Sequence, residues 1–512
     1  KYINHIYAKK HQVLPISRVG KTLTIATTSP LQRGEINALE SAYQVKTLQV
    51  LTSEHALLEG LNNLYSQQTH SFKITKANSG NDNHDDIKYL LDSSSQIEEP
   101  EVDEEVRMVS ENDSIILKLV NKIIYDAYVK KASDIHIEPY PGKENVVVRM
   151  RIDGECILYQ SIPYRYRFAI PSRIKIMADL DISERRKPQD GKIEFKRFGP
   201  LNIELRVATM PTSGGLEDVV IRILSNNEPL PLKELHLSAH NMAIFDRAVS
   251  SPYGLILVVG PTGSGKTTTL HSALAVLNRP NRKVWTAEDP IEISQKGLRQ
   301  VQVNPRIGFT FAKALRSFLR LDPDVIMVGE MRDAETASIA IEASLTGHLV
   351  LSTLHTNSAP ETVTRLLDMG LDPYAFSDSL LCVLAQRLVK KLCTNCREEY
   401  LPDGDELEKI VKEFGEGMPT EVVLGIIRED AVLYRAKGCP KCDNSGYSGR
   451  FAIHEMLECT DGIKESVRQR LPSDHIKKYA VSEGMKTLRM DGLAKVFQGI
   501  TDLREIRRVT LK

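Results

Sequence analysis

The sequence lacks any apolar run of the ~18 residues that a membrane-spanning helix needs. It also lacks a secretory signal, because it opens with the polar stretch KYINHIYAKKHQ. Since the first residue is Lys1 rather than Met, we expect further residues upstream of it. These absences predict a cytoplasmic protein that reaches a membrane peripherally, by docking on partners.

Neither sign of charge is in excess. The 67 Lys and Arg residues equal the 67 Asp and Glu residues, so the formal net charge is zero at pH 7. Proteins that bind phosphate backbones carry a basic stripe, and nothing in the overall charge of this chain points to one. The composition therefore argues against a nucleic-acid partner.

Cysteine is scarce, with seven residues in 512, yet four of the seven form two Cys-x-x-Cys pairs. Paired cysteines of this kind favour a metal site in a reducing compartment over disulfides. Cys393 and Cys396 precede Cys439 and Cys442, with 42 residues between the pairs. Four thiolates suit tetrahedral Zn²⁺ without an open position, which predicts a structural zinc site around an inserted helical element.

Residues 260–267 have the pattern Gly-x-x-x-x-Gly-Lys-Thr of a P-loop. The apolar run 255–259 before it predicts a buried strand, and 267–277 after it predicts a helix. Glycines let backbone N–H groups turn toward phosphate oxygens, and the helix N-terminus adds its positive dipole end. The predicted ATP cradle comprises Gly260, Pro261, Thr262, Gly263, Ser264, Gly265, Lys266, Thr267 and Thr268. Within it, Lys266 is expected beside the β- and γ-phosphates, and the Thr267 hydroxyl at Mg²⁺.

Three further apolar strands end in polar side chains. They are expected within residues 284–292, 322–333 and 346–357, with Glu288, Asp289 and Glu292, then Glu330, then His348 and His355. The carboxyl ends of parallel strands line the crevice where open α/β sheets bind ligands. Glu330 is therefore expected to hold Mg²⁺ or to orient the attacking water, and His355 to sense the γ-phosphate. His348 is left open between such a role and a backbone hydrogen bond.

Composition divides the chain into five segments. We predict an N-terminal α/β docking module at 1–68, an acidic flexible linker at 69–111 and a second α/β domain at 112–225. A Pro-containing hinge at 226–235 then leads into a nucleotide-binding domain at 236–512, which includes the zinc element at 390–455 and C-terminal helices. The fold class expected is therefore α/β throughout.

Four motifs carry a resemblance to a known family. GPTGSGKTTTL, AEDPIE, DPDVIMVGEMRD and TGHLVLSTLHTN resemble the Walker A, Asp box, Walker B and His box of the ATPases of type II secretion and type IV pilus assembly. The similarity continues through ASDIHIEP, RRKPQDGKI, RVATMP and LAQRLVKKLC, so it covers about 110–512 and is weaker over 1–68. It implies a RecA-like ATPase domain preceded by smaller, PAS-like α/β domains.

The resemblance also implies roles for particular residues. It places nucleotide between the P-loop domain and the preceding domain, with Arg206 and Arg222 as charge-stabilising arginines. Glu292 becomes the favoured water-activating carboxylate and Glu330 the group at Mg²⁺, although the division between the two stays open. The sequence departs from the family in PTSGGLED, where Gly214 and Gly215 stand without the histidine that is often found there.

The function implied is that of a homo-hexameric motor that hydrolyses ATP to assemble a pilus or secretion pseudopilus. Its expected partners are an inner-membrane platform protein and the cytoplasmic domains of the assembly system. An alternative is a nucleic-acid transport or uptake motor of the same superfamily, which DNA-stimulated hydrolysis would reveal. Another is a non-enzymatic adaptor whose N-terminal module senses a cyclic dinucleotide. Whether the cargo is a pilus or a pseudopilus stays open.

Overall fold

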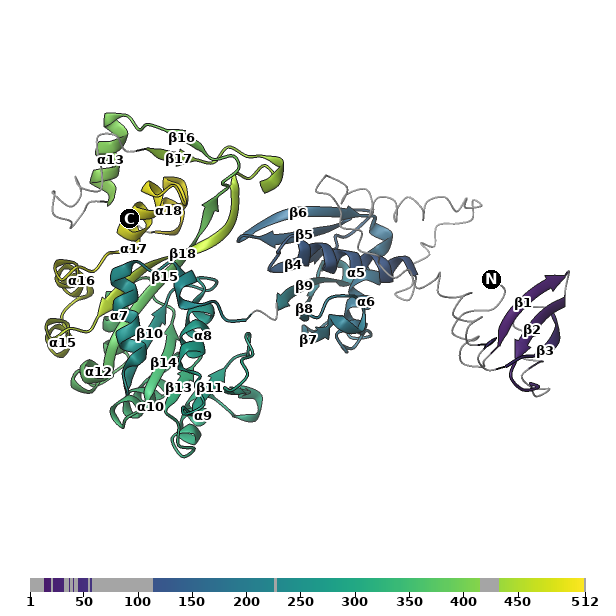
Figure 1. Cartoon of the computed structure of the whole chain (residues 1–512), viewed down its shortest axis with the longest axis horizontal. Coiled ribbons are helices and arrows are strands. Elements are labelled where there is room, and N and C mark those ends of the chain that lie inside the picture. The colour runs from purple at the N-terminus through teal and green to yellow at the C-terminus, as the bar shows by residue number, and fades with distance from the viewer. Residues whose placement is uncertain are drawn as a thin grey trace. The chain divides into compact units, whose positions relative to one another are not determined.

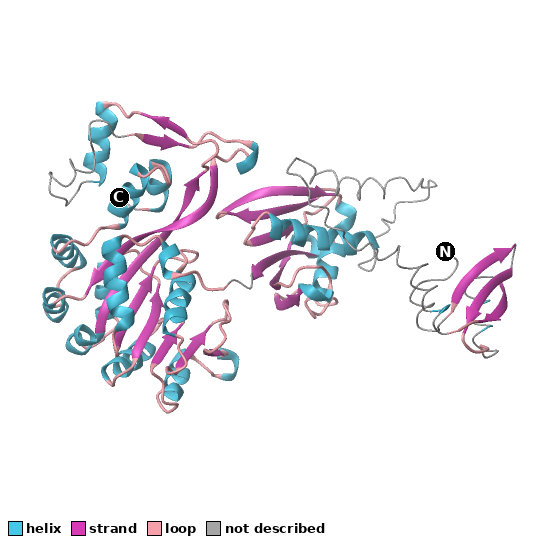
Figure 2. Cartoon of the chain, viewed as in Figure 1, coloured by secondary structure: helices cyan, strands magenta, loops and turns pink. Residues whose placement is uncertain are grey.

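The computed structural model of the chain divides into two compact units, Lys1–Lys88 and Tyr89–Lys512 (Figures 1 and 2). The residues that the structure describes are 13–19, 22–31, 36, 40, 45–53, 56–57, 114–224, 228–414 and 432–510. The linker predicted at 69–111, the start of the hinge and most of the helices predicted within 1–68 lie outside them.

The described part of the N-terminal unit is a three-stranded sheet in the order β1-β2-β3. Its strands are β1 (Leu14–Val19), β2 (Thr22–Thr27) and β3 (Lys46–Leu51). Strands β1 and β2 pair antiparallel, whereas β2 and β3 pair parallel. Leu23 and Ile25 of β2 are fully buried with Val13 and Leu57, as expected for the central strand of a small core. A PAS-like relationship for this module stays a prediction.

The second unit begins with a domain that we call the middle module, residues 114–224. Its antiparallel six-stranded sheet has the order β6-β5-β4-β9-β8-β7. The strands are β4 (Asp134–Glu138), β5 (Val146–Ile152), β6 (Glu155–Ile162), β7 (Gln189–Glu194), β8 (Glu204–Thr212) and β9 (Leu216–Leu224). Alternating burial along β5 shows that one face of the sheet packs inward.

Two helices, α5 (Ser114–Val129) and α6 (Ala169–Met177), pack on this sheet and on each other (Figure 1). The sequence stripe of α5 explains the packing, because Ile116, Leu119, Val120, Ile123 and Ile124 are all at most 1% exposed. The strands β5 and β6 are joined by Asp153 and Gly154, both with positive φ, as a tight hairpin turn requires.

A buried ion pair joins α6 to β9. The Lys175 side chain is fully buried, pairs with Glu217, and donates from Nζ to the Glu184 carbonyl at 2.8 Å. Breaking a buried pair leaves one charge without compensation, which costs about 3–5 kcal/mol.

We therefore expect Lys175→Met to lower the free energy of unfolding of the full chain by about 3 kcal/mol. Denaturant unfolding followed by circular dichroism measures this. The control is Lys192→Met, which breaks the 2.8 Å pair of Lys192 with Glu204, where both side chains are exposed. That exposed pair contributes at most about 1 kcal/mol. Equal losses for the two variants would contradict the prediction.

The rest of the unit, residues 228–510, is called the P-loop domain. Its central seven-stranded sheet has the order β12-β11-β13-β14-β10-β15-β18. The strands are β10 (Gly254–Val259), β11 (Val284–Glu288), β12 (Arg299–Gln302), β13 (Val325–Val328), β14 (Leu349–Leu354), β15 (Leu380–Leu392) and β18 (Tyr447–Glu458). All neighbours pair parallel except β15 and β18, so the sheet is mixed. The α/β class predicted from the sequence is confirmed.

Helices cover both faces of this sheet (Figure 2). They are α7 (Ala239–Ser250), α8 (Lys266–Leu277), α9 (Phe311–Phe318), α10 (Ala334–Leu345), α11 (Ala359–Asp368), α12 (Pro373–Ser379), α15 (Asp461–Arg468), α16 (Ser473–Ser482), α17 (Leu488–Phe497) and α18 (Leu503–Val509). Strand β10 is buried along its whole length, because its successive side chains point to opposite faces of the sheet and both faces are covered by helices. Leu255 and Leu257 join the core that includes α9 and α10, whereas Ile256 and Val258 join that of α7 and α8.

The element between the two cysteine pairs combines a short sheet with a helix. Strands β16 (Glu398–Tyr400) and β17 (Leu433–Arg435) pair antiparallel, and α13 (Gly404–Phe414) follows β16. The helix was expected from the sequence, whereas the strand pair was not. No helix in the described part of the chain is long and apolar enough to cross a membrane.

Candidate functional site

The P-loop lies between β10 and α8, as the sequence predicted. Gly260, Gly263 and Gly265 all have positive φ, which side chains rarely adopt. A Cβ on Gly260 would lie 2.6 Å from both the Gln386 carbonyl oxygen and Ser264 Oγ. At Gly263 the same atom would meet nothing within 4 Å. The loop therefore turns its backbone around an open space, which fits a phosphate group.

The lysine, carboxylate and histidine predicted from three motifs lie at one edge of the sheet. Lys266 Nζ donates to the carbonyls of Gly260 and Pro261, at 2.8 and 3.1 Å. Burial lowers the pKa of Lys266, and the nearby Glu330 and Glu292 carboxylates oppose that shift. The two carboxylates therefore lie close enough to the P-loop lysine to act on its charge.

Glu330 lies two residues after the end of β13, and its carboxylate is mostly buried between two basic side chains. His355 Nε2 lies 3.1 Å from Glu330 Oε1, and Arg332 Nε donates to Oε2 at 2.8 Å. The His355 side chain remains 44% exposed, so its ring can still reach a ligand. Glu330 and His355, which were predicted from two separate motifs, are thus brought together beside Lys266.

His348 lies at the other end of β14. Its Nδ1 is 2.8 Å from the Ala343 carbonyl, so this nitrogen carries the proton and donates to the backbone. The structure therefore places His348 in the backbone hydrogen bond that the sequence left open.

Glu292 lies on an exposed loop after β11, and the middle module reaches that loop. Arg206 Nη2 donates to the Ile291 carbonyl at 3.1 Å. Burial lowers the pKa of Arg206, and Glu292 offsets part of the shift. Arg222 faces Arg206 across the β8–β9 pair and binds Asp134, with Nε 2.9 Å from Oδ1.

A cavity of about 520 Å³ is lined by Arg222, Thr268 and Glu292. Thr268 belongs to the P-loop helix, whereas Arg222 comes from the middle module. Side chains from both domains therefore face one space, which reaches the first turn of the P-loop helix at Thr268. The roles assigned to Arg206, Arg222 and Glu292 stay predictions.

Strand β15 contributes two residues that sequence reasoning missed. Gln386 Nε2 donates to the Ser264 carbonyl at 2.7 Å, and its Oε1 accepts from Thr269 Oγ1 at 2.8 Å. Arg387 Nη2 donates to the Asn357 carbonyl, next to the His355 segment, at 2.9 Å. Gln386 therefore supports the P-loop, and Arg387 supports the segment that follows β14. The segment LAQRLVKKLC had been noted for its resemblance alone, without a strand assignment.

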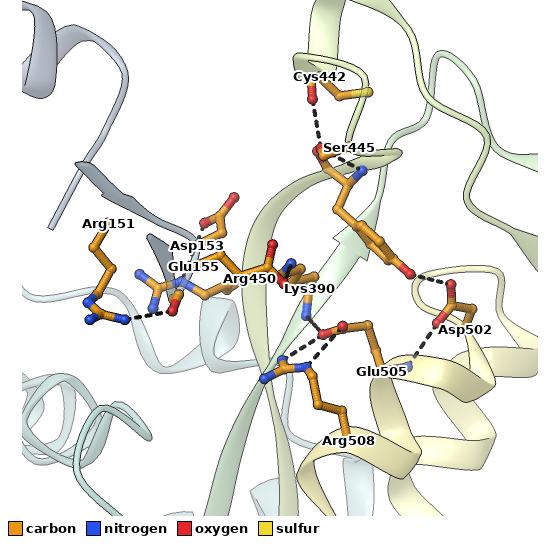
Figure 3. Close-up of polar contacts among 12 residues, drawn as sticks. Arg151, Asp153, Glu155, Lys390, Cys442, Ser445, Arg450, Asp502, Glu505 and Arg508 are labelled. Carbon is orange, nitrogen blue, oxygen red and sulfur yellow. Dashed lines mark hydrogen bonds and ion pairs between the residues drawn. The ribbon is translucent and has the colours of Figure 1, made fainter. Parts of the chain in front are cut away.

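A second contact joins the middle module to the P-loop domain at the β5–β6 turn (Figure 3). Asp153 accepts from the Gly449 N–H at 3.0 Å and pairs with Arg450 at 3.4 Å. Lys390 Nζ lies 2.5 Å from Glu155 Oε1, and this hydrogen bond lowers the pKa of the Glu155 carboxyl. The hairpin is thereby bound to strands β15 and β18.

The four predicted zinc ligands form one cluster, with all four Sγ atoms within 4.8 Å of one another. Neighbouring sulfurs are 3.7 to 3.9 Å apart. A Zn–S bond of about 2.3 Å implies a separation of about 3.8 Å in a tetrahedron. Backbone N–H groups of Cys439 and Gly446 point at Cys442 Sγ, each at 3.3 Å. The four thiols therefore fit a structural Zn²⁺.

Comparison with known proteins agrees with this geometry. The family described as "Type II/IV secretion system protein" matches residues 109–508, and the description "MshEN domain" matches residues 1–71. The chain belongs to the Type II/IV secretion system protein family.

Members of this family resemble the chain over most of its length. The "Type IV pilus assembly ATPase PilB" of Myxococcus xanthus is 42% identical over 502 residues, which cover 98% of this chain and 84% of that protein. The "Type II secretion system ATPase E" of Vibrio cholerae is 46% identical over 402 residues, or 78% and 76% of the two chains. Together with the P-loop geometry, these relatives establish that the family member described here is an ATPase.

A solved structure extends the likeness to the fold. The "Pilus Retraction Motor PilT and Bound ADP" aligns with a TM-score of 0.52 and 25% identity, over 77% of this chain and 97% of that one. The alignment shows that the two chains share a fold over this length. Zinc is supported here by the four-cysteine cluster rather than by any relative.

Proposed function

We propose that the chain is a homo-hexameric motor that hydrolyses ATP to ADP and phosphate and powers assembly of a type IV pilus or type II secretion pseudopilus. The observation that carries the proposal is the cavity lined by both Thr268 of the P-loop helix and Arg222 of the middle module. A nucleotide held from both sides links its hydrolysis to the relative position of two domains. The P-loop domain would then be RecA-like, as the motif resemblance implies.

Each predicted residue has a place in this chemistry. The P-loop N–H groups and Lys266 bind the phosphates, and the Thr267 hydroxyl and Glu330 would hold Mg²⁺. Bound there, Mg²⁺ neutralises charge on the transferred phosphoryl group. Glu292 orients and deprotonates the attacking water, a role that it would share with Glu330.

The charge that develops during transfer needs further stabilisation. Arg206 already reaches the Glu292 loop, and the exposed guanidinium of Arg222 lines the cavity. Both can approach the phosphates when the domains close. His355 contacts Glu330 and would also contact the γ-phosphate. Release of that phosphate would therefore change the contact between the ends of β13 and β14.

The proposed location is the cytoplasmic face of the inner membrane, where a platform protein and the cytoplasmic domains of an assembly system would be the partners. The names of the relatives support a role in pilus assembly or type II secretion. The equal numbers of acidic and basic residues continue to argue against a nucleic-acid substrate.

The test is the effect of Arg206→Ala and Arg222→Ala on the purified full chain. We expect each to lower kcat for ATP by at least ~10²-fold, since arginines that stabilise transferring phosphates contribute ~10³–10⁵ in other NTPases. The control is Arg197→Ala, an exposed arginine of the same module that pairs with Glu194 at 2.7 Å.

Light scattering during gel filtration with Mg–ATP measures the assembly state, which we expect to be hexameric. A chain that stays monomeric in every nucleotide condition and hydrolyses ATP normally without either arginine would refute the motor. Hydrolysis stimulated by DNA would instead favour a nucleic-acid motor.

A further inference from the structure

A buried polar network lies between the P-loop helix α8 and the loop that carries Glu292. Its central residue, His271, is fully buried on α8, one turn after the Thr267 that ends the P-loop motif. His271 Nε2 lies 3.2 Å from Glu288 Oε2, and Nδ1 lies 2.8 Å from Gln295 Nε2. None of these contacts belongs to the P-loop, the Walker B strand or the arginines described above.

The hydrogen bonds determine the state of the His271 ring. Gln295 Nε2 also donates to the His271 carbonyl at 2.9 Å, and a carbonyl can accept but not donate, so this amide atom is the nitrogen. His271 Nδ1 must therefore accept from Gln295. The ring proton is then on Nε2, which donates to Glu288.

Glu288 is the acceptor at the centre of the network, and only 4% of its surface is exposed. Its Oε1 accepts from Thr286 Oγ1 at 2.6 Å and from Gln300 Nε2 at 2.9 Å. Burial raises the pKa of the Glu288 carboxyl, but the hydrogen bonds from His271, Thr286 and Gln300 outweigh it and lower that pKa. The carboxylate is therefore ionised and holds its three donors in fixed directions.

The same side chains hold the backbone on both sides of Ser294 in the loop. Gln300 Nε2 donates to the Ile293 carbonyl at 2.8 Å, and Gln300 Oε1 accepts from the Gln295 N–H at 2.9 Å. Ile293 is the residue after Glu292, so the network fixes the backbone next to the Glu292 side chain. The loop has no regular secondary structure between β11 and β12 that would do this instead.

We propose that His271 is a positioning residue for ATP hydrolysis. Through Glu288 and Gln295 it fixes the position of the Glu292 loop relative to the P-loop helix. This inference rests on the proposed role of Glu292. It adds a connection that the sequence motifs do not contain, because His271 lies on the phosphate-binding helix and Glu292 on a separate loop. A shift of α8 on phosphate binding would be passed to the carboxylate through buried hydrogen bonds.

The test compares two deletions of a buried imidazole in the full-length chain. His271→Leu removes the centre of the network. His454→Leu is the matched control, because His454 is also fully buried, on β18, yet neither of its ring nitrogens has a hydrogen-bond partner among the described residues. We expect His271→Leu to lower kcat about tenfold with KM for Mg–ATP changed less than about twofold, since a small misplacement of a reacting group costs rate rather than affinity.

Two readouts separate positioning from general damage. Binding of ADP, measured by calorimetry, should stay within about twofold of the wild type in both leucine variants, because the phosphate cradle is untouched. His271→Gln retains a donor near the Nε2 position and should recover part of the lost kcat. Equal losses of kcat in the His271 and His454 leucine variants would overturn the proposal.

A double-mutant cycle with Glu292→Gln tests whether His271 acts through Glu292. If it does, His271→Leu should lower the residual single-turnover rate of Glu292→Gln by less than about twofold, because the group it positions is already lost. A full tenfold loss in that background would overturn the inference while leaving the role of Glu292 intact. Normal turnover by Glu292→Gln alone would instead refute the proposed function of that carboxylate.

Discussion

A Glu330→Gln variant is expected to bind Mg–ATP with affinity close to that of the wild type and to turn it over at least ~10²-fold more slowly. The reason is that the carboxylate lies beside Lys266 and between His355 and Arg332, where its negative charge would organise Mg²⁺ and water. Glutamine keeps the shape of the side chain and removes the charge. Phosphate release measures the rate, and calorimetry with ADP or a slowly hydrolysed ATP analogue measures the affinity.

The matched control for this variant is Glu335→Gln, which removes the same charge five positions later. Glu335 lies in the first turn of α10, and its exposed carboxylate pairs with Arg316 at 2.5 Å. An exposed pair of this kind contributes at most about 1 kcal/mol to stability, and it lies outside the site. Turnover by Glu330→Gln at the rate of the control would remove Glu330 from the mechanism.

A Cys439→Ser variant is expected to lose the bound zinc and the folded state of the element between β15 and β18. Structural zinc contributes on the order of 10–16 kcal/mol to the folding of small zinc domains, and a hydroxyl is a poor replacement for a thiolate ligand. Emission spectroscopy of the purified chain should find one zinc ion per wild-type chain and much less than one in the variant. Limited proteolysis should then cut the variant between the cysteine pairs.

The control for the zinc experiment is Cys156→Ser. Cys156 is a half-buried free thiol on β6, outside the four-cysteine cluster. Its variant should keep zinc and resist the protease like the wild type. Equal zinc contents in the two serine variants would show that the cluster does not hold the metal.

Local patterns in the sequence were sufficient for the centre of the site. The P-loop needs a strand, a glycine-rich turn and a helix in immediate succession, and β10 and α8 flank it as expected. The polar ends of β11, β13 and β14 were also predicted, because apolar runs that stop at acidic or histidine residues are visible without tertiary information. The cysteine cluster followed from spacing alone.

The contacts that support the site could not be predicted from such patterns. Gln386 reaches Ser264 across 122 positions of the sequence, and Arg206 reaches Ile291 across 85. Neither contact has a periodic or spaced signature, since both depend on which strands become neighbours in the folded sheet. The signal that could have found Gln386 is the long β-prone run from Leu380 to Leu392, where a polar residue is otherwise out of place on a buried strand.

Strand β15 has a mechanical consequence. Gln386, near the middle of the strand, donates a hydrogen bond to the P-loop. Cys393 follows directly after the last residue of the strand, Leu392. Cys393 comes seven positions after Gln386, a span of about 23 Å at ~3.3 Å per residue of strand. A displacement of β15 at the P-loop would therefore also displace the first cysteine of the four-cysteine cluster, which couples the positions of the two sites through one strand.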